Sequence, residues 1–173
     1  MAENLGRAQR VHFIGIGGSG LSAIARLLLA SGYVVSGSDR TLSPLAHDLM
    51  QAGVTVFEGH AAENIVGADL VVRSSAIADD NIEVIAARDA GIPVQKRAEF
   101  LNTLLSKYQT LAVAGSHGKT TTSTMLAWSL DQLGKQPGFI LGGVFSNLGI
   151  NARAGGGTYF VIEADEYDYM FLG

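Results

Sequence analysis

The stretch that decides the fold is residues 11–32, VHFIGIGGSGLSAIARLLLASG. Its first residues, 11–17, are typical of a buried strand that enters a turn. Glycines stand at positions 15, 17 and 20, and the apolar residues after them recur at helical spacing until Gly32. The order strand, glycine loop, helix predicts the opening of a βαβ unit in a parallel sheet.

The same alternation continues downstream. Further strands are predicted at residues 33–39, 54–59, 70–73 and 92–97, and helices at residues 44–53, 81–91 and 97–108. Asn81 is a plausible cap for the second of these helices. Strands that alternate with helices predict an α/β fold, a Rossmann-like domain whose parallel sheet is covered on both faces.

A second unit begins near residue 109. It has a strand, a loop, a helix over residues 120–134, an apolar run at 137–143, a glycine-rich patch at 155–157 and a last strand at 158–165. We therefore predict two domains, residues 1–107 and residues 108–173. Because a P-loop domain usually has several more strands after its first acidic strand, we expect the second domain to be truncated.

Composition excludes several classes of protein. The chain has 173 residues, 47% of them hydrophobic, with a net charge of −4 and no cysteine. The absence of a Lys/Arg run argues against nucleic-acid binding, and the absence of cysteine excludes disulfides and thiolate metal sites. The N-terminus is polar and the apolar runs are too short to span a bilayer, so we expect no membrane insertion and a cytoplasmic location.

The first glycine loop has the spacing G-x-G-x-x-G, formed by Gly15, Gly17 and Gly20. Such a loop between strand and helix favours a nucleotide diphosphate, and Asp39 ends the next strand, where an acid often meets a ribose hydroxyl. The alternative is that the glycines only let helix and sheet pack closely. Nothing in the loop itself distinguishes NAD from a UDP-sugar.

The second loop, residues 115–120, reads GSHGKT. Its backbone N–H groups can wrap phosphate oxygens, Lys119 can place a cation on terminal phosphates, and the Thr120 hydroxyl can bind magnesium. The common P-loop spacing would place its first glycine where Val113 stands, so this loop is a shorter variant. His117, inside it, either contacts a phosphate or fills the turn.

Two polar segments follow predicted strands. The last strand ends in a cluster of acids, Glu163, Asp165, Glu166 and Asp168, and an acid at such a strand tip typically holds magnesium in P-loop folds. A solvated acidic turn is the alternative. The segment Ser74, Ser75, Ala76 and Ile77 either binds a ligand through its hydroxyls or caps a helix. His12, His47 and His60 read as ordinary surface or core-edge histidines.

The ordered motifs HFIGIGGSGLSAIA, GSD, SSAI, RAEFL, AGSHGKTTT, NARAG and EADEYD resemble those of the Mur ligases. Together they cover nearly the whole chain from Val11 onward. The resemblance implies a first domain that binds a UDP-sugar, residues 1–107, and a central domain that binds ATP and Mg²⁺, residues 108–173. A third domain, which brings in the amino acid, would be missing. The use of two nucleotides, a UDP-sugar and ATP, would explain why the chain has two phosphate loops.

The resemblance also implies an activity. A Mur ligase of the type that adds L-alanine to UDP-N-acetylmuramate forms an acyl phosphate from the substrate carboxylate and ATP, and the amine then displaces phosphate. Such a role belongs to peptidoglycan precursor synthesis. We expect no turnover from this chain alone.

Site residues follow from the matched motifs. The UDP-sugar would lie against Gly15, Gly17, Gly18, Ser19, Gly20, Asp39, Ser74, Ser75, Ala76 and Ile77. ATP would lie against Gly115, Ser116, His117, Gly118, Lys119, Thr120 and Thr121. Lys119, Glu163 and His117 would act in catalysis, and Thr120 and Glu163 would ligate magnesium. Asn147, Arg153 and Glu166 are weaker candidates.

Rival functions stay open at this stage. The second half also resembles a murein-peptide ligase, which adds a recycled tripeptide to the same sugar nucleotide, and Tyr167 departs from the serine expected in alanine-adding enzymes. An NAD-dependent Rossmann oxidoreductase would explain the first loop but not the second. A P-loop kinase with an appended Rossmann-like unit, or a non-catalytic nucleotide-sugar binding module, would also fit. The oligomeric state is not determined by the sequence.

Overall fold

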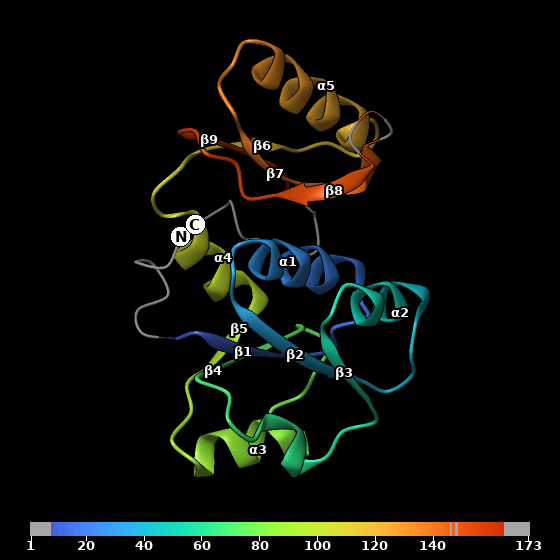
Figure 1. Cartoon of the computed structure of the whole chain (residues 1–173), viewed down its shortest axis with the longest axis vertical. Coiled ribbons are helices and arrows are strands. Elements are labelled where there is room, and N and C mark those ends of the chain that lie inside the picture. The colour runs from blue at the N-terminus through green and yellow to red at the C-terminus, as the bar shows by residue number, and fades with distance from the viewer. Residues whose placement is uncertain (1–7, 146, 148, 165–173) are drawn as a thin grey trace. The chain divides into compact units, whose positions relative to one another are not determined.

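The computed structural model describes residues 8–145, 147 and 149–164. The chain forms two compact units, Met1–Leu104 and Leu105–Gly173, each with its own sheet (Figure 1). Within the described ranges, no helix combines the length and the apolar character needed to cross a bilayer.

The first unit is built on a parallel sheet of five strands in the order β3-β2-β1-β4-β5. The sequence order reverses beside β1, and in open α/β sheets ligands bind at the carboxyl ends of the strands at such a point. The strands are β1 (Arg10–Ile14), β2 (Val34–Asp39), β3 (Thr55–Glu58), β4 (Leu70–Arg73) and β5 (Val94–Lys96).

Helices cover both faces of this sheet. The helices α1 (Ser19–Ala30) and α2 (Pro44–Gln51) lie on one face and α3 (Ile82–Asp89) lies on the other (Figure 1). A short 3₁₀ helix, η2 (Ala62–Ile65), follows β3, and α4 (Arg97–Leu105) follows β5. The predicted parallel sheet with two covered faces is confirmed. The 3₁₀ turn was not predicted.

Local signals explain where these helices begin. The Ser43 side chain accepts a hydrogen bond from the Ala46 N–H, with Pro44 as the first helical residue of α2. The Asn81 side chain accepts from the Glu83 N–H at the start of α3, as predicted. Both caps satisfy N–H groups that a helix leaves without a partner in its first turn.

The second unit has a four-stranded sheet in the order β6-β9-β7-β8. Its elements are β6 (Gln109–Val113), α5 (Lys119–Gln132), β7 (Gly138–Phe145), β8 (Ile150–Arg153) and β9 (Tyr159–Glu163). The strands β6, β9 and β7 are parallel, whereas β8 pairs with β7 in antiparallel fashion. The strand β8 was not predicted, because its sequence, INAR, lacks a β-branched or aromatic run.

One apolar cluster fixes α5 on this sheet. Ala127 packs with Phe139, Leu141, Phe145 and Val161, all buried. The Trp128 ring meets the Phe145 ring edge-to-face, with 5.6 Å between centroids. The packing sets the position of the helix start, where the second glycine loop ends.

Candidate functional site

The second glycine loop joins the carboxyl end of β6 to the start of α5. Gly118 caps the helix with a φ of 77°, a left-handed conformation that suits glycine, and Gly115 has a φ of 145°. The side chains from Ser116 to Thr122 are exposed, apart from a half-buried Lys119. The loop therefore presents its backbone and the helix N-terminus to solvent, as an anion-binding loop requires.

Lys119 folds back over this loop. Its Nζ donates a hydrogen bond to the Gly115 carbonyl oxygen at 2.6 Å. The ammonium group therefore lies beside the turn that would receive phosphates. Ser116, His117 and Thr121 make no side-chain hydrogen bond within the described residues. They remain accessible to a ligand.

Glu163, at the end of β9, is the centre of the polar group beside the loop. Its Oε2 accepts a hydrogen bond from the Thr120 hydroxyl at 3.1 Å. Its Oε1 accepts from the Ser123 hydroxyl at 2.9 Å and from the Gly142 N–H at 2.7 Å. Since Val113 pairs with Glu163 in parallel register, the strand end that carries the acid lies next to the strand end that begins the loop.

Two members of this group were missed by the sequence interpretation, Ser123 and Gly142. A Cβ atom on Gly142 would come within 2.7 Å of Glu163 Oε2 and 3.1 Å of Thr120 Oγ1. The glycine therefore leaves room for the acid. The pair Gly142–Gly143 within an apolar strand was the available signal, because glycine inside a strand often marks a close approach.

The residues present fit a magnesium ion. No group of three or more His, Asp or Glu side chains is arranged as a metal site in the described ranges. Mg²⁺ in nucleotide sites is usually bound by one or two protein oxygens, with phosphates and waters completing its shell. The Thr120 hydroxyl and Glu163 Oε2 are two such oxygens, close together at the phosphate loop.

The first glycine loop is held by residues at the end of β2. The Gly15 and Ile16 N–H groups donate to the Ser38 carbonyl oxygen at 2.8 and 3.1 Å. The Gly17 N–H donates to Asp39 Oδ2 at 2.8 Å. Asp39, expected to face a ribose, therefore holds the loop with one of its oxygens. Gly18 is exposed at the start of α1, and its N–H donates a hydrogen bond to the Gly15 carbonyl oxygen at 3.2 Å.

Close packing explains the spacing of the loop glycines. A Cβ atom on Gly17 would meet Ser43 Oγ at 2.8 Å and Asp39 Oδ2 at 2.9 Å. A Cβ atom on Gly20 would overlap the Arg97 guanidinium group. The sequence left two explanations for these glycines, close packing of helix and sheet or diphosphate binding. Close packing explains Gly17 and Gly20. Diphosphate binding stays a prediction for the exposed Gly18 and Ser19.

The segment of residues 74–77 lies against the first loop. Its Ser74 Cβ lies 3.1 Å from the position that a Cβ on Gly15 would take. Ser75 and Ala76 are exposed, and Ile77 is half-buried. Arg73, almost fully buried, donates hydrogen bonds to the Ile77 carbonyl and to Asp79. The arginine therefore shapes the segment, and the sequence interpretation had given it no role.

Other candidates are not brought to the phosphate loop. Arg153 donates to Asp131 Oδ1 at 2.6 Å and to the Pro137 carbonyl. Asp131 stands twelve residues after Lys119, about 18 Å along a helix that rises ~1.5 Å per residue. Asn147 is exposed in the turn between β7 and β8. The predicted acids Asp165, Glu166 and Asp168, together with Tyr167, lie outside the described residues.

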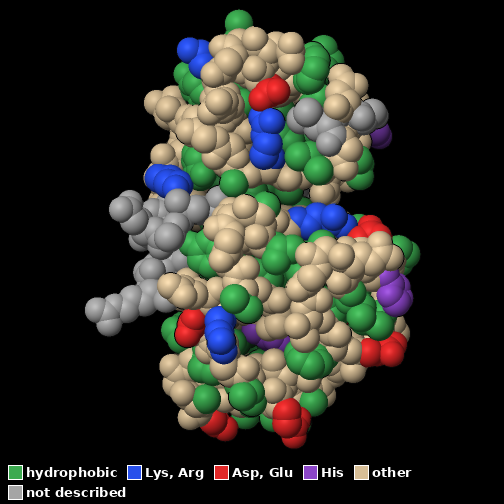
Figure 2. Space-filling view, in the orientation of Figure 1, with side chains coloured by type: hydrophobic (Ala, Val, Ile, Leu, Met, Phe, Trp, Pro, Cys, Tyr) green, Lys and Arg blue, Asp and Glu red, His purple; other side chains and the backbone are tan. Residues whose placement is uncertain are grey.

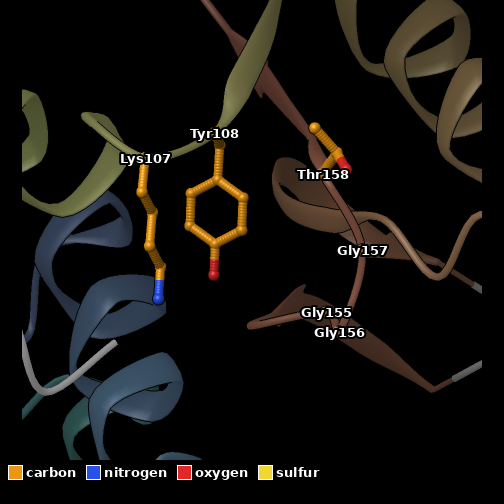
Figure 3. A pocket seen from close by; sticks show the side chains of 6 residues that line it. All are labelled: Lys107, Tyr108, Gly155, Gly156, Gly157 and Thr158. Carbon is orange, nitrogen blue, oxygen red and sulfur yellow. The ribbon is translucent and has the colours of Figure 1, made fainter.

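The glycine-rich patch at residues 155–157 has a structural explanation. The Gly156 and Gly157 N–H groups donate to the Gln136 carbonyl oxygen. Figure 3 shows these glycines beside Lys107 and Tyr108, where they line an open pocket of about 340 Å³. Because the Gly156 and Gly157 N–H groups are used inside the protein, this patch does not form a third phosphate loop.

On the face shown in Figure 2, basic side chains lie apart from one another and are interspersed with acidic ones. His47 is exposed, as an ordinary surface histidine would be. His12 is fully buried, so the prediction that it is an ordinary surface or core-edge residue was wrong. His60 is 19% exposed, at the edge of the core as predicted, and its Nδ1 lies 3.1 Å from the buried Glu83 carboxylate.

Comparison with known proteins agrees with this arrangement. Residues 10–109 match the model of the Mur ligase family, catalytic domain. A UDP-N-acetylmuramate–L-alanine ligase of Bordetella avium is 50% identical over 96% of this chain and 36% of its own length. One of Pelodictyon phaeoclathratiforme is 48% identical over 97% of this chain and 35% of its own length. The chain thus spans about a third of the curated relatives it matches.

Solved structures give the same picture. A UDP-N-acetylmuramate-alanine ligase from Thermotoga maritima superposes with a TM-score of 0.81 at 34% identity, over 89% of this chain and 37% of that one. A murein peptide ligase from Psychrobacter arcticus superposes with a TM-score of 0.83 at 35% identity, over 92% and 38%. The family model covers more than half of the chain, and we conclude that the chain belongs to the Mur ligase family.

Proposed function

We propose that this chain provides the sugar-nucleotide-binding and ATP-binding parts of a ligase that joins L-alanine to UDP-N-acetylmuramate in peptidoglycan precursor synthesis. The observation that carries the proposal is the group of Lys119, Thr120 and Glu163 at a glycine loop, in a chain whose first unit has a separate glycine loop. Curated relatives about half identical to this chain are named as ligases of that kind. We expect the enzyme to work in the cytoplasm.

The two units would bind different nucleotides. In the first, the exposed start of α1 at Gly18 and Ser19 would receive the UDP diphosphate, next to Asp39 and residues 74–77. In the second, residues 115–121 would receive the ATP phosphates. Thr120 and Glu163 would hold Mg²⁺, which neutralises charge on the phosphates. We propose residues 1–107 and 108–173 as the limits of these two functional parts.

The chemistry would be amide formation in two steps. A carboxylate oxygen of UDP-N-acetylmuramate attacks the γ-phosphorus of ATP, and ADP leaves, which gives an acyl phosphate. The amine of L-alanine then attacks the acyl carbon, and inorganic phosphate and a proton leave. The Lys119 ammonium group would stabilise the charge of the phosphoryl group in transfer. His117, exposed in the loop, would contact the same phosphates.

A second candidate differs only in the amine. Solved murein peptide ligases superpose as well as the alanine-adding enzyme does, with TM-scores of 0.83 against 0.81. The solved enzymes of the two kinds are 34% and 35% identical to this chain, whereas curated relatives that are about 50% identical are named as alanine ligases, which supports L-alanine. A turnover assay of the whole enzyme with L-alanine and with the tripeptide as competing amines distinguishes the two.

The first test is calorimetric titration of this chain with UDP-N-acetylmuramate, with NADH as the matched control. We expect binding of the sugar nucleotide and none of NADH. The reverse result would reject the ligase proposal in favour of an oxidoreductase. The Lys119, Thr120 and Glu163 group argues against that outcome, because hydride transfer has no use for a site of this kind.

A further inference from the structure

A carboxylate that no part of the proposed reaction uses is buried inside the first unit. The side chain of Glu83, in the first turn of α3, has 0% of its surface exposed. Its Oε2 accepts a hydrogen bond from the Ser38 hydroxyl at 2.5 Å and lies 3.1 Å from His60 Nδ1. Its Oε1 accepts from Asn64 Nδ2 at 2.6 Å. Glutamate is almost never buried to this extent without such partners.

These partners keep the carboxylate ionised. Burial opposes ionisation, but the neighbouring His12 imidazole, the Ser38 hydroxyl and the Asn64 amide outweigh it and lower the pKa of Glu83 to about 2. His12 Nε2 lies 3.9 Å from Glu83 Oε1, which is an ion-pair separation and too long for a hydrogen bond. The carboxylate is therefore a strong acceptor at neutral pH.

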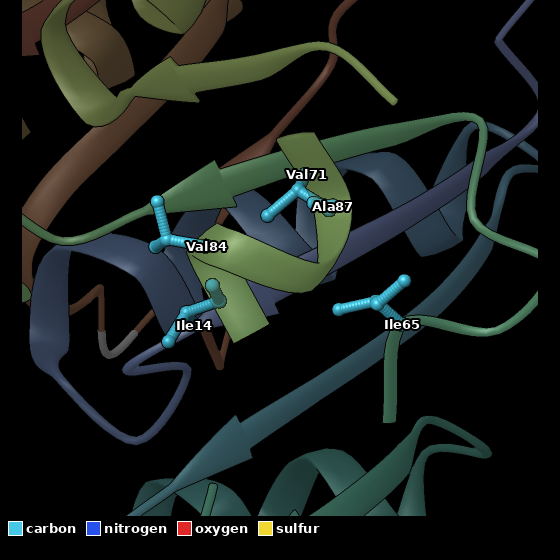
Figure 4. Close-up of a cluster of buried hydrophobic side chains, with 5 residues drawn as sticks. All are labelled: Ile14, Ile65, Val71, Val84 and Ala87. Carbon is cyan, nitrogen blue, oxygen red and sulfur yellow. The ribbon is translucent and has the colours of Figure 1, made fainter. Parts of the chain in front are cut away.

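The position of Glu83 is fixed by packing. Val84 and Ala87 on α3 pack against Ile14, Val71 and Ile65, all buried (Figure 4). In the close-up, this apolar cluster gathers between α3 and the strands beneath it. Glu83 directly precedes Val84 on this helix. Because the helix is packed against the sheet, the Glu83 carboxylate has a fixed position beside it.

Ser38 connects this carboxylate to the first glycine loop. Its hydroxyl is bound by Glu83, and its backbone carbonyl accepts the Gly15 and Ile16 N–H groups at 2.8 and 3.1 Å. The next residue, Asp39, accepts the Gly17 N–H. The loop is thus anchored to two consecutive residues at the end of β2, and one of them is anchored in turn to α3.

The same carboxylate determines which ring nitrogen of His60 carries the proton. A serine hydroxyl has a single hydrogen, and Ser38 donates it to Glu83. Toward His60 Nδ1, both the Ser38 oxygen and the Glu83 carboxylate can therefore only accept. Nδ1 must carry the proton, which leaves Nε2 unprotonated in the neutral ring. His60 follows the carboxyl end of β3, on the edge of the sheet where the glycine loop lies.

We propose that Glu83 is a positioning residue of the nucleotide site in the first unit. Glu83 lies on α3, on the face of the sheet opposite α1. It holds the glycine loop through Ser38 and fixes the tautomer of His60. The identity of the nucleotide as a uridine diphosphate rests on the proposed function, whereas the link from Glu83 to the loop does not.

The test compares Glu83→Gln with Glu99→Gln in this chain. Glu99 is a matched control, because it also lies in the first turn of a helix of the same unit but is exposed. We expect amide hydrogen exchange at Gly15, Ile16 and Gly17 to be at least tenfold faster in Glu83→Gln. Exchange at Val71 and Val72, in the sheet centre, serves as the reference and stays near the wild-type value.

Two further readouts separate positioning from general destabilisation. Nitrogen chemical shifts of the His60 ring report a protonated Nδ1 in wild type and a mixture of tautomers in Glu83→Gln. Calorimetry with uridine diphosphate gives an affinity at least tenfold weaker for Glu83→Gln than for Glu99→Gln. Equal loop exchange and equal ring shifts in the two variants would overturn the proposal.

A second variant, which keeps the Glu83 carboxylate, tests the proposal if the first variant does not fold. If Glu83→Gln does not fold, Ser38→Ala removes the hydroxyl link alone, and the same faster exchange of the loop amides is expected. Unchanged exchange in Ser38→Ala would then overturn the proposal. If the wild-type chain does not bind uridine diphosphate, the proposed function fails, while the exchange and ring-shift comparisons still decide the role of Glu83.

Discussion

Thr120 and Glu163 stand 43 positions apart in the chain, yet the Thr120 hydroxyl lies 3.1 Å from a Glu163 carboxylate oxygen. The contact exists because β6, which leads to Thr120, pairs directly with β9, which ends at Glu163. Two oxygens of the kind that magnesium prefers thus meet beside a loop built to surround phosphate. The Gly142 N–H holds the other carboxylate oxygen in place.

Replacement of Gly142 by alanine is expected to displace Glu163. The added methyl group would come within 2.7 Å of the carboxylate, closer than real Cβ contacts allow. We expect the magnesium-dependent part of ATP affinity to fall at least tenfold, measured by titration of ATP with and without Mg²⁺. Gly143→Ala is the control, because its methyl would lie 3.4 Å from the Thr120 methyl, close to ordinary contact. Equal affinities for the two variants would contradict the assignment.

Loss of the Lys119 ammonium group should weaken ATP binding. Its Nζ lies 2.6 Å from the Gly115 carbonyl, over the loop that would hold the phosphates. We expect Lys119→Ala to bind ATP at least tenfold more weakly in the presence of Mg²⁺, because a charge-assisted contact to phosphate is lost. Lys135→Ala removes the same charge from an exposed turn and should bind ATP as wild type does. Calorimetric titration of the two variants with ATP and Mg²⁺ measures this difference in affinity.

Gly37 should be intolerant of a side chain. A Cβ there would meet the Ile16 side chain at 2.5 Å and the Phe13 carbonyl oxygen at 2.6 Å. We expect Gly37→Ala to lower the free energy of unfolding of the first unit by about 1–3 kcal/mol, as overpacking does. Gly18→Ala has a φ of −73° and a nearest neighbour at 3.5 Å, so its cost should stay below about 1 kcal/mol. Urea unfolding of both variants measures the difference.

Acid should remove the stability that Glu83 contributes. The pKa of this carboxyl is about 2 in the folded protein, below its ordinary value of 4.5. A lowered pKa stabilises the folded state above about pH 4.5, and this contribution declines as the pH falls from 4.5 towards 2. The shift corresponds to about 3 kcal/mol at neutral pH.

The measurement is urea unfolding of wild type and Glu83→Gln at neutral pH and at decreasing pH. We expect the wild type to be more stable at pH 7 and the difference between the two proteins to narrow below pH 4.5. The same titration of Glu99→Gln corrects for the other carboxylates of the unit. A difference between wild type and Glu83→Gln that does not change with pH would show that the charge of Glu83 contributes nothing.

Much of the fold followed from local patterns. The strand β4 has the predicted bounds, Leu70–Arg73, and Asn81 caps α3 as expected. Both glycine loops lie between a strand and a helix, as their spacing indicated. Signals of this kind act over a few residues, through hydrogen bonds and periodic burial that the sequence alone displays. The short strand β8 was not predicted, because its four residues have no strong strand propensity.

The sequence by itself determined the alternation of strands and helices, the two loops and the residue types offered to phosphate and magnesium. Only the tertiary structure decided which distant groups meet. The strand order places Gly142 beside Glu163 and turns Asp39 toward the Gly17 N–H. Packing of α3 buries Glu83 behind Ser38. Each of these contacts joins residues about twenty or more positions apart, and chain folding, not local propensity, sets their distance.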